Sequence, residues 1–188
     1  MKSILLSLVA VTFLSSCARF SRQTIKSEPA AIPTQSQPTP QATSRYPAPQ
    51  GFINDFANVI DAEAEGRLDA LVKNLKAKAN IEFAIVTLDT TNKEPIFDYS
   101  LGMAREWGVG SKESSQGGGM LLLVAVKDRQ WRLQVSRALE KELPDEVLKK
   151  LGEESVPLYR KSDFAGGIEK YVTLVIKELE KRRNRRIL

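Results

Sequence analysis

The most regular pattern of apolar and polar positions lies between Gly117 and Val135. Residues 120–126 (MLLLVAV) are a continuous apolar run after glycines, which is typical of a strand covered on both faces. A polar turn follows at residues 127–129, and in residues 130–135 (QWRLQV) polar and apolar positions alternate strictly. We therefore expect the innermost strand of a sheet, followed by an antiparallel edge strand with one covered face. The polar face of that edge strand carries Arg132, a residue type that discourages pairing with another chain.

Two helices and a second buried strand are predicted upstream of this hairpin. Residues 81–88 (IEFAIVTL) are apolar and β-branched after Glu82, which indicates a buried strand. The helix before it starts at the N-cap Asp61 and has its apolar positions at helical spacing, namely Leu68, Leu71, Val72, Leu75 and Ala79. The helix after it begins at Pro95 and ends at Gly108. A strand, a helix and a strand in this order form a right-handed crossover, so the two strands should be parallel.

Two further helical patterns follow the edge strand. The first runs from Pro144 to about Ser155, and the second runs from the N-cap Asp163 to about Arg183. The apolar residues of the second form one stripe, which consists of Phe164, Ile168, Tyr171, Val172, Val175 and Leu179. Helices thus occur before, between and after the strands. The sequence predicts an α/β fold, namely a three-layer α/β/α sandwich on a small mixed sheet with an antiparallel edge hairpin.

The N-terminus predicts export and lipidation. Residues 1–16 combine Lys2 with an apolar run at residues 4–14 that is too short to span a bilayer, as in a signal peptide. Residues 14–17 (LSSC) resemble a bacterial lipobox, in which the cysteine becomes the lipidated first residue of the mature protein. We expect lipid attachment at Cys17, and hence a membrane-anchored, extracytoplasmic protein. If the cell is Gram-negative, the expected location is the outer membrane or the periplasmic face. A signal peptide with an incidental cysteine is the alternative.

The segment between the predicted anchor and the folded domain has a different composition. Residues 17–50 are rich in Pro, Ser, Thr and Gln and show no apolar periodicity, so we expect a disordered tether. A flexible chain of this length has an r.m.s. span of about 30 Å. The folded domain is expected at residues 51–183, and residues 184–188 are expected to form a basic tail. With 188 residues, the chain has room for one such domain.

The composition argues against several kinds of active site. The chain has no histidine, the commonest general base, and its one cysteine is assigned to anchoring. Gly117, Gly118 and Gly119 suggest a phosphate cradle, but such loops lie between a strand and the next helix, whereas these glycines precede a strand. A close backbone approach at the start of the central strand is the favoured interpretation. The net charge is +5, but nucleic acid is not expected as a partner of an exported protein.

Two polar loops should meet at one end of the sheet. Because the edge strand runs antiparallel to the central strand, its exit at residues 136–140 must lie beside residues 111–119, which lead into the central strand. Irregular loops on a rigid scaffold often carry function, so this pair of loops is a candidate site. Two merely solvated connections are the alternative.

A basic cluster ends the chain and consists of Lys181, Arg182, Arg183, Arg185 and Arg186. One interpretation is a solvated helix end whose charges complement the helix dipole. The other is contact with anionic lipid headgroups, or with another polyanion, through charge attraction.

The order of these segments resembles the TPM domain family, which is named for plant thylakoid-lumen and photosystem-repair proteins and a nematode receptor auxiliary protein. The similarity covers roughly residues 52–180 through the segments FINDFANVIDAEAEGRLDALVKNL, IEFAIVTLD, DYSLGMAREWGVGSK, MLLLVAVKDRQWRLQV, LEKELPDE and YRKSDFAGGIEKYV. The resemblance implies an α/β/α sandwich and extracytoplasmic bacterial members attached to membranes. It also implies a link to divalent metal, often calcium, and to a weak phosphatase activity.

The family's pattern further implies where site residues would lie. A V-N-D segment corresponds to Asn54 and Asp55, so the resemblance makes Asp55 the candidate metal ligand. A D-N-G triplet falls on Gly117, Gly118 and Gly119, which lack the aspartate.

A G-Y-G segment of the family follows the edge strand and falls on residues 136–138, where Arg137 stands in place of the tyrosine. Glu140 fits the continuation of that segment. A cation site loses affinity when a carboxylate is lost and a guanidinium is added nearby. The missing aspartate of the glycine triplet and the presence of Arg137 therefore favour one of two arrangements. Either an anionic group binds near Arg137, or Arg137 pairs locally with Asp55 or Glu140.

Three hypotheses follow. The leading one is a lipid-anchored, non-enzymatic TPM-type module without a cofactor, which presents a binding surface in the cell envelope. The alternative is a phosphatase or hydrolase dependent on calcium or magnesium, with Asp55 and either Glu140 or Glu113 as ligands. The third is an assembly or repair factor for an envelope protein complex.

Overall fold

The computed structural model of the chain describes residues 44–110 and 118–188. The predictions for the signal peptide, for Cys17 and for most of the tether fall outside the described residues. The same holds for Glu113 and Gly117, which lie in the loop before the central strand.

Four strands form one sheet in the order β1-β2-β3-β4. They are β1 (Ile53–Asp55), β2 (Glu82–Leu88), β3 (Gly119–Ala125) and β4 (Gln130–Val135). The first three strands are parallel, and β4 pairs antiparallel with β3. The predicted parallel pair, the inner position of residues 120–126 and the antiparallel edge strand are thus confirmed. The short strand β1, which forms the other edge, was not predicted.

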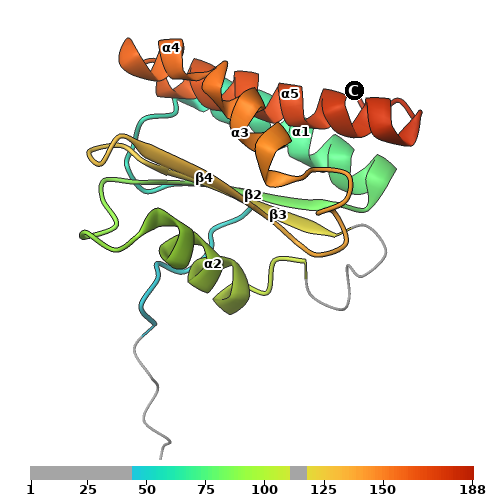
Figure 1. Cartoon of the computed structure of the whole chain (residues 1–188). Coiled ribbons are helices and arrows are strands. Elements are labelled where there is room, and N and C mark those ends of the chain that lie inside the picture. Colours follow the sequence, from blue (N-terminus) through green and yellow to red (C-terminus); the bar gives the residue numbers. More distant parts are fainter. Residues whose placement is uncertain (1–43, 111–117) are drawn as a thin grey trace, which may run out of the picture. The chain divides into compact units, whose positions relative to one another are not determined.

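Five helices cover the sheet, and Figure 1 shows that they do so unevenly. On one face lies α2 (Ile96–Glu106) alone. On the other face lie α1 (Ala62–Ala79), α3 (Asp145–Glu153), α4 (Val156–Arg160) and α5 (Phe164–Arg183). The predicted three-layer α/β/α sandwich is confirmed, with the short helix α4 as an unpredicted addition. Within the described ranges no helix is both long and apolar enough to cross a membrane.

The predicted caps fix where the two long helices begin. The Asp61 side chain accepts a hydrogen bond from the Ala64 backbone N–H at 2.8 Å, and the Asp163 side chain accepts one from Gly166 at 2.9 Å. Both contacts satisfy amide groups that lack a partner within the helix. Both helices end at an asparagine in the left-handed conformation, Asn80 for α1 and Asn184 for α5.

The continuous apolar run of β3 is explained by burial on both faces. Met120, Leu122 and Val124 belong to the core on the α1 and α5 side, and they are at most 3% exposed. Leu121 and Leu123 belong to the core on the α2 side and are fully buried. Complete burial of such a side chain stabilises a fold by about 1.5–3 kcal/mol, so β3 contributes strongly to both cores.

The alternating pattern of β4 predicts one covered and one solvated face, but the structure shows that α2 covers part of the polar face. Gln134 on the polar face is only 8% exposed. Its Nε2 donates hydrogen bonds to the Phe97 backbone oxygen at 3.1 Å and to Ser100 Oγ at 2.9 Å. The guanidinium of Arg132 lies over the Phe97 ring, 4.9 Å from its centroid. The face is polar because its neighbours on α2 are hydrogen-bonding partners.

The folded domain begins before the predicted boundary at residue 51. Residues 43–188 form one compact unit, and Tyr46 is only 9% exposed. The Tyr46 ring lies edge-on to Tyr99 with 5.0 Å between centroids, in the space left by the missing side chain of Gly102. Trp107 Nε1 donates to the backbone oxygen of Pro47 at 3.1 Å. The last part of the predicted tether is therefore a strap, residues 44–50, whose first half packs on α2.

The predicted basic tail at residues 184–188 is also part of the fold. Ile187 is fully buried in the core on the α1 and α5 side. Glu180 Oε1 accepts hydrogen bonds from the backbone N–H groups of Ile187 and Leu188, which turns the chain back after α5. Hydrogen bonds from these two amides, Leu188 first, lower the pKa of Glu180.

Candidate functional site

The two loops expected to meet at one end of the sheet do so in their described parts. The Ser136 backbone N–H donates to the Gly119 backbone oxygen at 2.8 Å. In return the Gly119 N–H donates to Ser136 Oγ at 3.0 Å. The chain then turns, with the Leu139 N–H donating to the Ser136 backbone oxygen at 2.8 Å. Arg137 and Glu140 are exposed on this turn.

The glycines at the start of β3 allow a close backbone approach, as the favoured interpretation expects. A Cβ on Gly119 would overlap the backbone of Gly110, which passes directly beside it. Gly118 has a φ of 92°, a conformation that other residues rarely adopt. Gly117, the third glycine of the set, lies outside the described residues.

A groove of about 730 Å³ runs between α2 and β4 and reaches the turn after β4. One part of its wall is apolar and includes Phe97, Leu101 and Ala104 from α2. The rest is polar and holds three arginines from three different segments. The polar lining consists of Arg105, Arg132, Gln134, Ser136, Arg137, Glu140 and Asp145. The predicted candidates Gly119, Arg137 and Glu140 thus share one groove.

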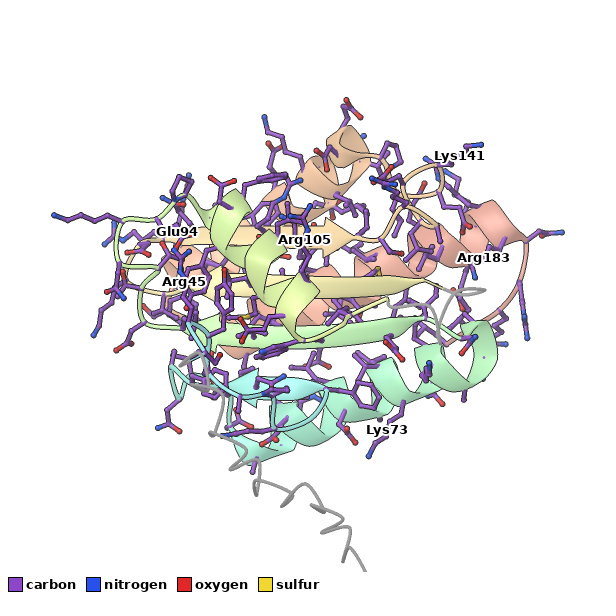
Figure 2. The ribbon with its side chains drawn as sticks, turned by 90° about the horizontal axis from the view of Figure 1, so that it is seen from below. Arg45, Lys73, Glu94, Arg105, Lys141 and Arg183 are labelled. Carbon is purple, nitrogen blue, oxygen red and sulfur yellow. The ribbon has the colours of Figure 1, made fainter. Side chains whose placement is uncertain are left out.

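The arginines of the groove differ in how they are engaged. Arg132 forms an ion pair with Asp145, with 3.0 Å between Nη2 and Oδ1. Arg105 and Arg137 are exposed, and neither forms an ion pair with another described residue. Figure 2 shows Arg105 on α2, which crosses the sheet in this view. Two guanidinium groups that have no carboxylate partner among the described residues therefore border the groove, together with the exposed Glu140.

Asp55 lies elsewhere and has a local role. It is the last residue of β1, and its carboxylate accepts hydrogen bonds from the Val59 N–H at 3.1 Å and the Ile60 N–H at 2.8 Å. It also accepts a hydrogen bond from Thr87 Oγ1. These contacts hold the loop that leads into α1. The neighbouring Asn54 is fully buried and binds backbone groups of Gln50 and Gly51.

The sheet register separates Asp55 from the groove. Asp55 pairs with Thr87, which pairs with Val124, whereas Gly119 is at the other end of β3. Five residues along a strand and two strand spacings across the sheet correspond to about 16 Å and about 10 Å. Asp55 and Glu140 therefore do not meet, so the structure does not assemble this ligand pair of the metal-dependent alternative. The other pair includes Glu113, which lies outside the described residues. Arg137 pairs with neither Asp55 nor Glu140.

The physical reason for this separation is strand direction. β1 and β3 are parallel, so a residue that ends β1 and a residue that starts β3 must lie at opposite ends of the sheet. Among the residues that the structure describes, no group of three or more acidic, cysteine or histidine side chains is arranged to hold a metal ion.

Arg105 is the site residue that sequence reasoning missed. It lies in the last turn of α2, one helical turn after Leu101, and both line the groove. A basic residue in a last helical turn is usually explained by the helix dipole. Only the packing of α2 beside β4 and its following turn brings Arg105 and Arg137 to one groove.

The chain belongs to the TPM domain family, because a model of the TPM domain matches residues 53–178. Among solved structures, the N-terminal domain of a protein from P. gingivalis superposes with a TM-score of 0.65 at 27% identity, covering 71% of this chain and 85% of that one. The match therefore spans most of the folded part.

Two more distant structures share the fold. The N-terminal domain of a protein from Corynebacterium glutamicum has a TM-score of 0.54 at 16% identity and covers 70% of this chain and 82% of its own. The BA42 protein of the psychrophilic bacterium Bizionia argentinensis has the same TM-score and identity, with 65% and 83% covered. No curated protein matches the sequence.

Proposed function

We propose that the protein is a lipid-anchored binding module of the cell envelope, which uses the groove between α2 and β4 to bind an acidic segment of a partner protein. The observation that carries the proposal is the pair Arg105 and Arg137, which border one groove and have no carboxylate partner among the described residues. A guanidinium binds a carboxylate through two parallel N–H donors, which gives both strength and orientation.

The apolar part of the groove supports a protein segment as the ligand. Phe97 is 46% exposed, which is unusual for a side chain of its size in this fold. Together with Leu101 and Ala104 it offers apolar contact beside the two arginines. Binding sites of this kind combine apolar walls with a few polar groups that fix orientation. A peptide with acidic and apolar side chains matches both parts, whereas a free inorganic anion would use only the arginines.

The proposed anchor supports the same role. Lipidation at Cys17 followed by a flexible tether would keep the domain near the membrane and raise its effective concentration toward a partner that is also in the envelope. An interaction of modest intrinsic affinity would then suffice for assembly or repair of an envelope complex.

Site-specific crosslinking in the native cell tests the proposal. A photo-crosslinking amino acid replaces Ala104 in the groove, and the control carries it at Ala70, which is exposed on α1. We expect a protein adduct at residue 104 that is absent at residue 70. The adduct should disappear in the variant Arg105→Glu with Arg137→Glu.

A matched charge control separates the groove from a general effect of net charge. Lys149→Glu with Lys150→Glu makes the same charge change on exposed positions of α3 and should leave the adduct in place. An adduct that survives reversal of both groove arginines, or that forms equally at residue 70, would show that the groove is not the binding site.

A further inference from the structure

The helices α1 and α5 run in the same direction, and this places their C-terminal ends together. Arg67 in the first half of α1 binds Glu169 in the first half of α5, with 3.0 Å between Nε and Oε2. Figure 1 shows both helices along the same face of the sheet, with α5 ending near the C-terminus of the chain. The last turns of the two helices therefore lie at the same end of the sandwich.

Each of these helices is charged to complement its own dipole. α1 has Glu63 and Glu65 in its first turn and Lys76 and Lys78 in its last. α5 starts at the cap Asp163 and has three basic residues in its last turn. A single helix of this kind needs no explanation beyond the dipole. Parallel packing, however, brings two basic ends side by side, although like charges repel.

The turn after β4 adds a further cation to the same end. Glu142 in this turn forms an ion pair with Arg183 of α5, with 2.5 Å between Nε and Oε2. This contact places the turn that holds Lys141 beside the end of α5, and Figure 2 shows Lys141 and Arg183 at the same end of the domain. Three separate segments therefore contribute positive charge to one end of the domain.

Arg186 at this end donates to the backbone oxygen of Leu188. Besides Arg186, five exposed cations at this end form no ion pair with another described residue. We call them the basic end; they are Lys78, Lys141, Lys177, Lys181 and Arg185.

Four carboxylates near the basic end already bind other groups. Glu82 binds Lys76, Glu178 binds Arg182 and Glu142 binds Arg183. Glu180 accepts the backbone N–H groups of the returning C-terminus. The charge of the basic end is therefore not neutralised by these neighbours.

We propose that the basic end docks on a bilayer that contains anionic phospholipid. Its cations come from separate segments, and none of the five lines either the groove between α2 and β4 or the smaller hollow between β4 and α3. Charges that come from several segments and lie outside both hollows suit a surface of laterally mobile headgroups. In a protein held near the bilayer by a lipid anchor, a contact of this kind would fix the orientation of the domain at the surface.

Vesicle binding by residues 43–188 tests this proposal, since these residues form one compact unit. Vesicles of phosphatidylcholine mixed with phosphatidylglycerol are compared with phosphatidylcholine alone in a sedimentation assay. We expect binding to the mixed vesicles only, and its loss when salt is raised to about 1 M, because salt screens exposed charges.

The decisive variant replaces Lys78, Lys177, Lys181 and Arg185 by Gln, and binding should weaken at least about tenfold, given the contribution of each basic residue near an anionic surface. The matched control replaces Lys149, Lys150, Arg160 and Lys161 by Gln. These four residues are exposed and lie on α3, α4 and the following turn, away from the end of α5. Their substitution removes the same amount of positive charge as the decisive variant does. The control should bind nearly as well as the unmodified protein.

Three results would overturn the proposal. One is equal weakening in both variants, which would show an effect of net charge alone. The second is no preference of the unmodified protein for anionic vesicles. The third is binding to heparin without binding to vesicles, which would point to a soluble polyanion. All three leave the groove proposal untouched, because the variants keep Arg105 and Arg137.

Discussion

At the scale of single residues, Asp55 shows that a carboxylate in a family motif can hold a loop in place through hydrogen bonds. Its two oxygens accept hydrogen bonds from the backbone of Val59 and Ile60 and from the Thr87 hydroxyl. A charged acceptor with several donors satisfies amide groups that would otherwise lose hydrogen bonds on folding. Asp55 therefore holds the connection from β1 to α1, which is a structural role.

The first prediction is that Asp55→Ala lowers the stability of the domain. We expect a loss of about 2–4 kcal/mol in the free energy of unfolding, because hydrogen bonds to a charged group are each worth roughly 1.5–3 kcal/mol and are not additive. Urea denaturation of residues 43–188 measures it.

Glu140→Ala provides the control for this prediction, since Glu140 is exposed and forms no ion pair with another described residue. Its effect should stay within about 0.5 kcal/mol. Equal stabilities for Asp55→Ala and the unmodified domain would contradict the structural role. Because Asp55→Ala is expected to destabilise the domain, reduced phosphatase turnover in this variant would not by itself identify Asp55 as a catalytic residue.

At the scale of elements, periodicity and capping predicted the long helices and the three longer strands. The N-caps Asp61 and Asp163 lie where the sequence placed them, because a capping carboxylate before an apolar stripe is a local signal. The site was predicted in part. Topology placed Gly119 beside Ser136 correctly, but the family pattern alone could not show that Asp55 lies at the other end of the sheet.

The parts that were not predicted share a physical reason. β1 has three residues, and a period of two cannot be recognised over so short a length. Tyr46 and Ile187 are single apolar residues within polar, proline-rich or basic segments, so their burial depends on tertiary packing. The polar face of β4 is covered because α2 packs beside it, and this too depends on tertiary packing.

The second prediction concerns the strap, residues 44–50. A protein that begins at residue 51 lacks Tyr46 and should unfold at lower urea concentration than one that begins at residue 43. Tyr46→Ala in the longer protein should cost about 3 kcal/mol, as for other buried aromatic side chains.

Gly102→Val tests the same contact from the side of α2, because a Cβ there would overlap the Tyr46 hydroxyl. Gly66→Val is the control, since no atom lies within 4 Å of a Cβ at that position of α1. If the proteins that begin at residues 43 and 51 were equally stable, the strap would not belong to the folded domain.

The third prediction concerns the C-terminal return after α5 and its dependence on pH. The pKa of Glu180 is lowered by hydrogen bonds from the backbone of Leu188 and Ile187. A lowered pKa in the folded state means that the carboxylate adds stability above its unfolded pKa of about 4.3, and that this stability is lost as the pH falls through the folded value. Glu180→Gln should therefore lower the Tm at pH 7, and the difference from the unmodified protein should shrink below about pH 4.

Thermal denaturation at both pH values measures this effect. Glu153→Gln is the control, because Glu153 is exposed and makes no ion pair among the described residues. A difference between Glu180→Gln and the unmodified protein that stayed the same at both pH values would show that the Glu180 charge does not hold the returning chain.

At the scale of the whole molecule, two kinds of membrane contact are proposed for one chain. The basic end lies where α1 and α5 finish, while the proposed lipid anchor is separated from the folded domain in the sequence by a long, proline-rich segment. A tether alone would let the domain turn freely. Docking through the basic end would restrict that freedom and fix how the groove is presented to a partner.

The fourth prediction is that Cys17→Ser abolishes lipidation. The thiol of Cys17 is the only one in the chain, and the proposed modification attaches lipid to this sulfur before the signal peptide is removed. A serine hydroxyl cannot replace it, so the precursor should stay unprocessed in the inner membrane. Labelling with a fatty acid, followed by fractionation, measures both steps, and Ser21→Ala in the tether is the control that should be labelled and processed normally. A Cys17→Ser protein that is processed and released like the unmodified one would contradict lipid anchoring and leave the basic end as the remaining proposed membrane contact.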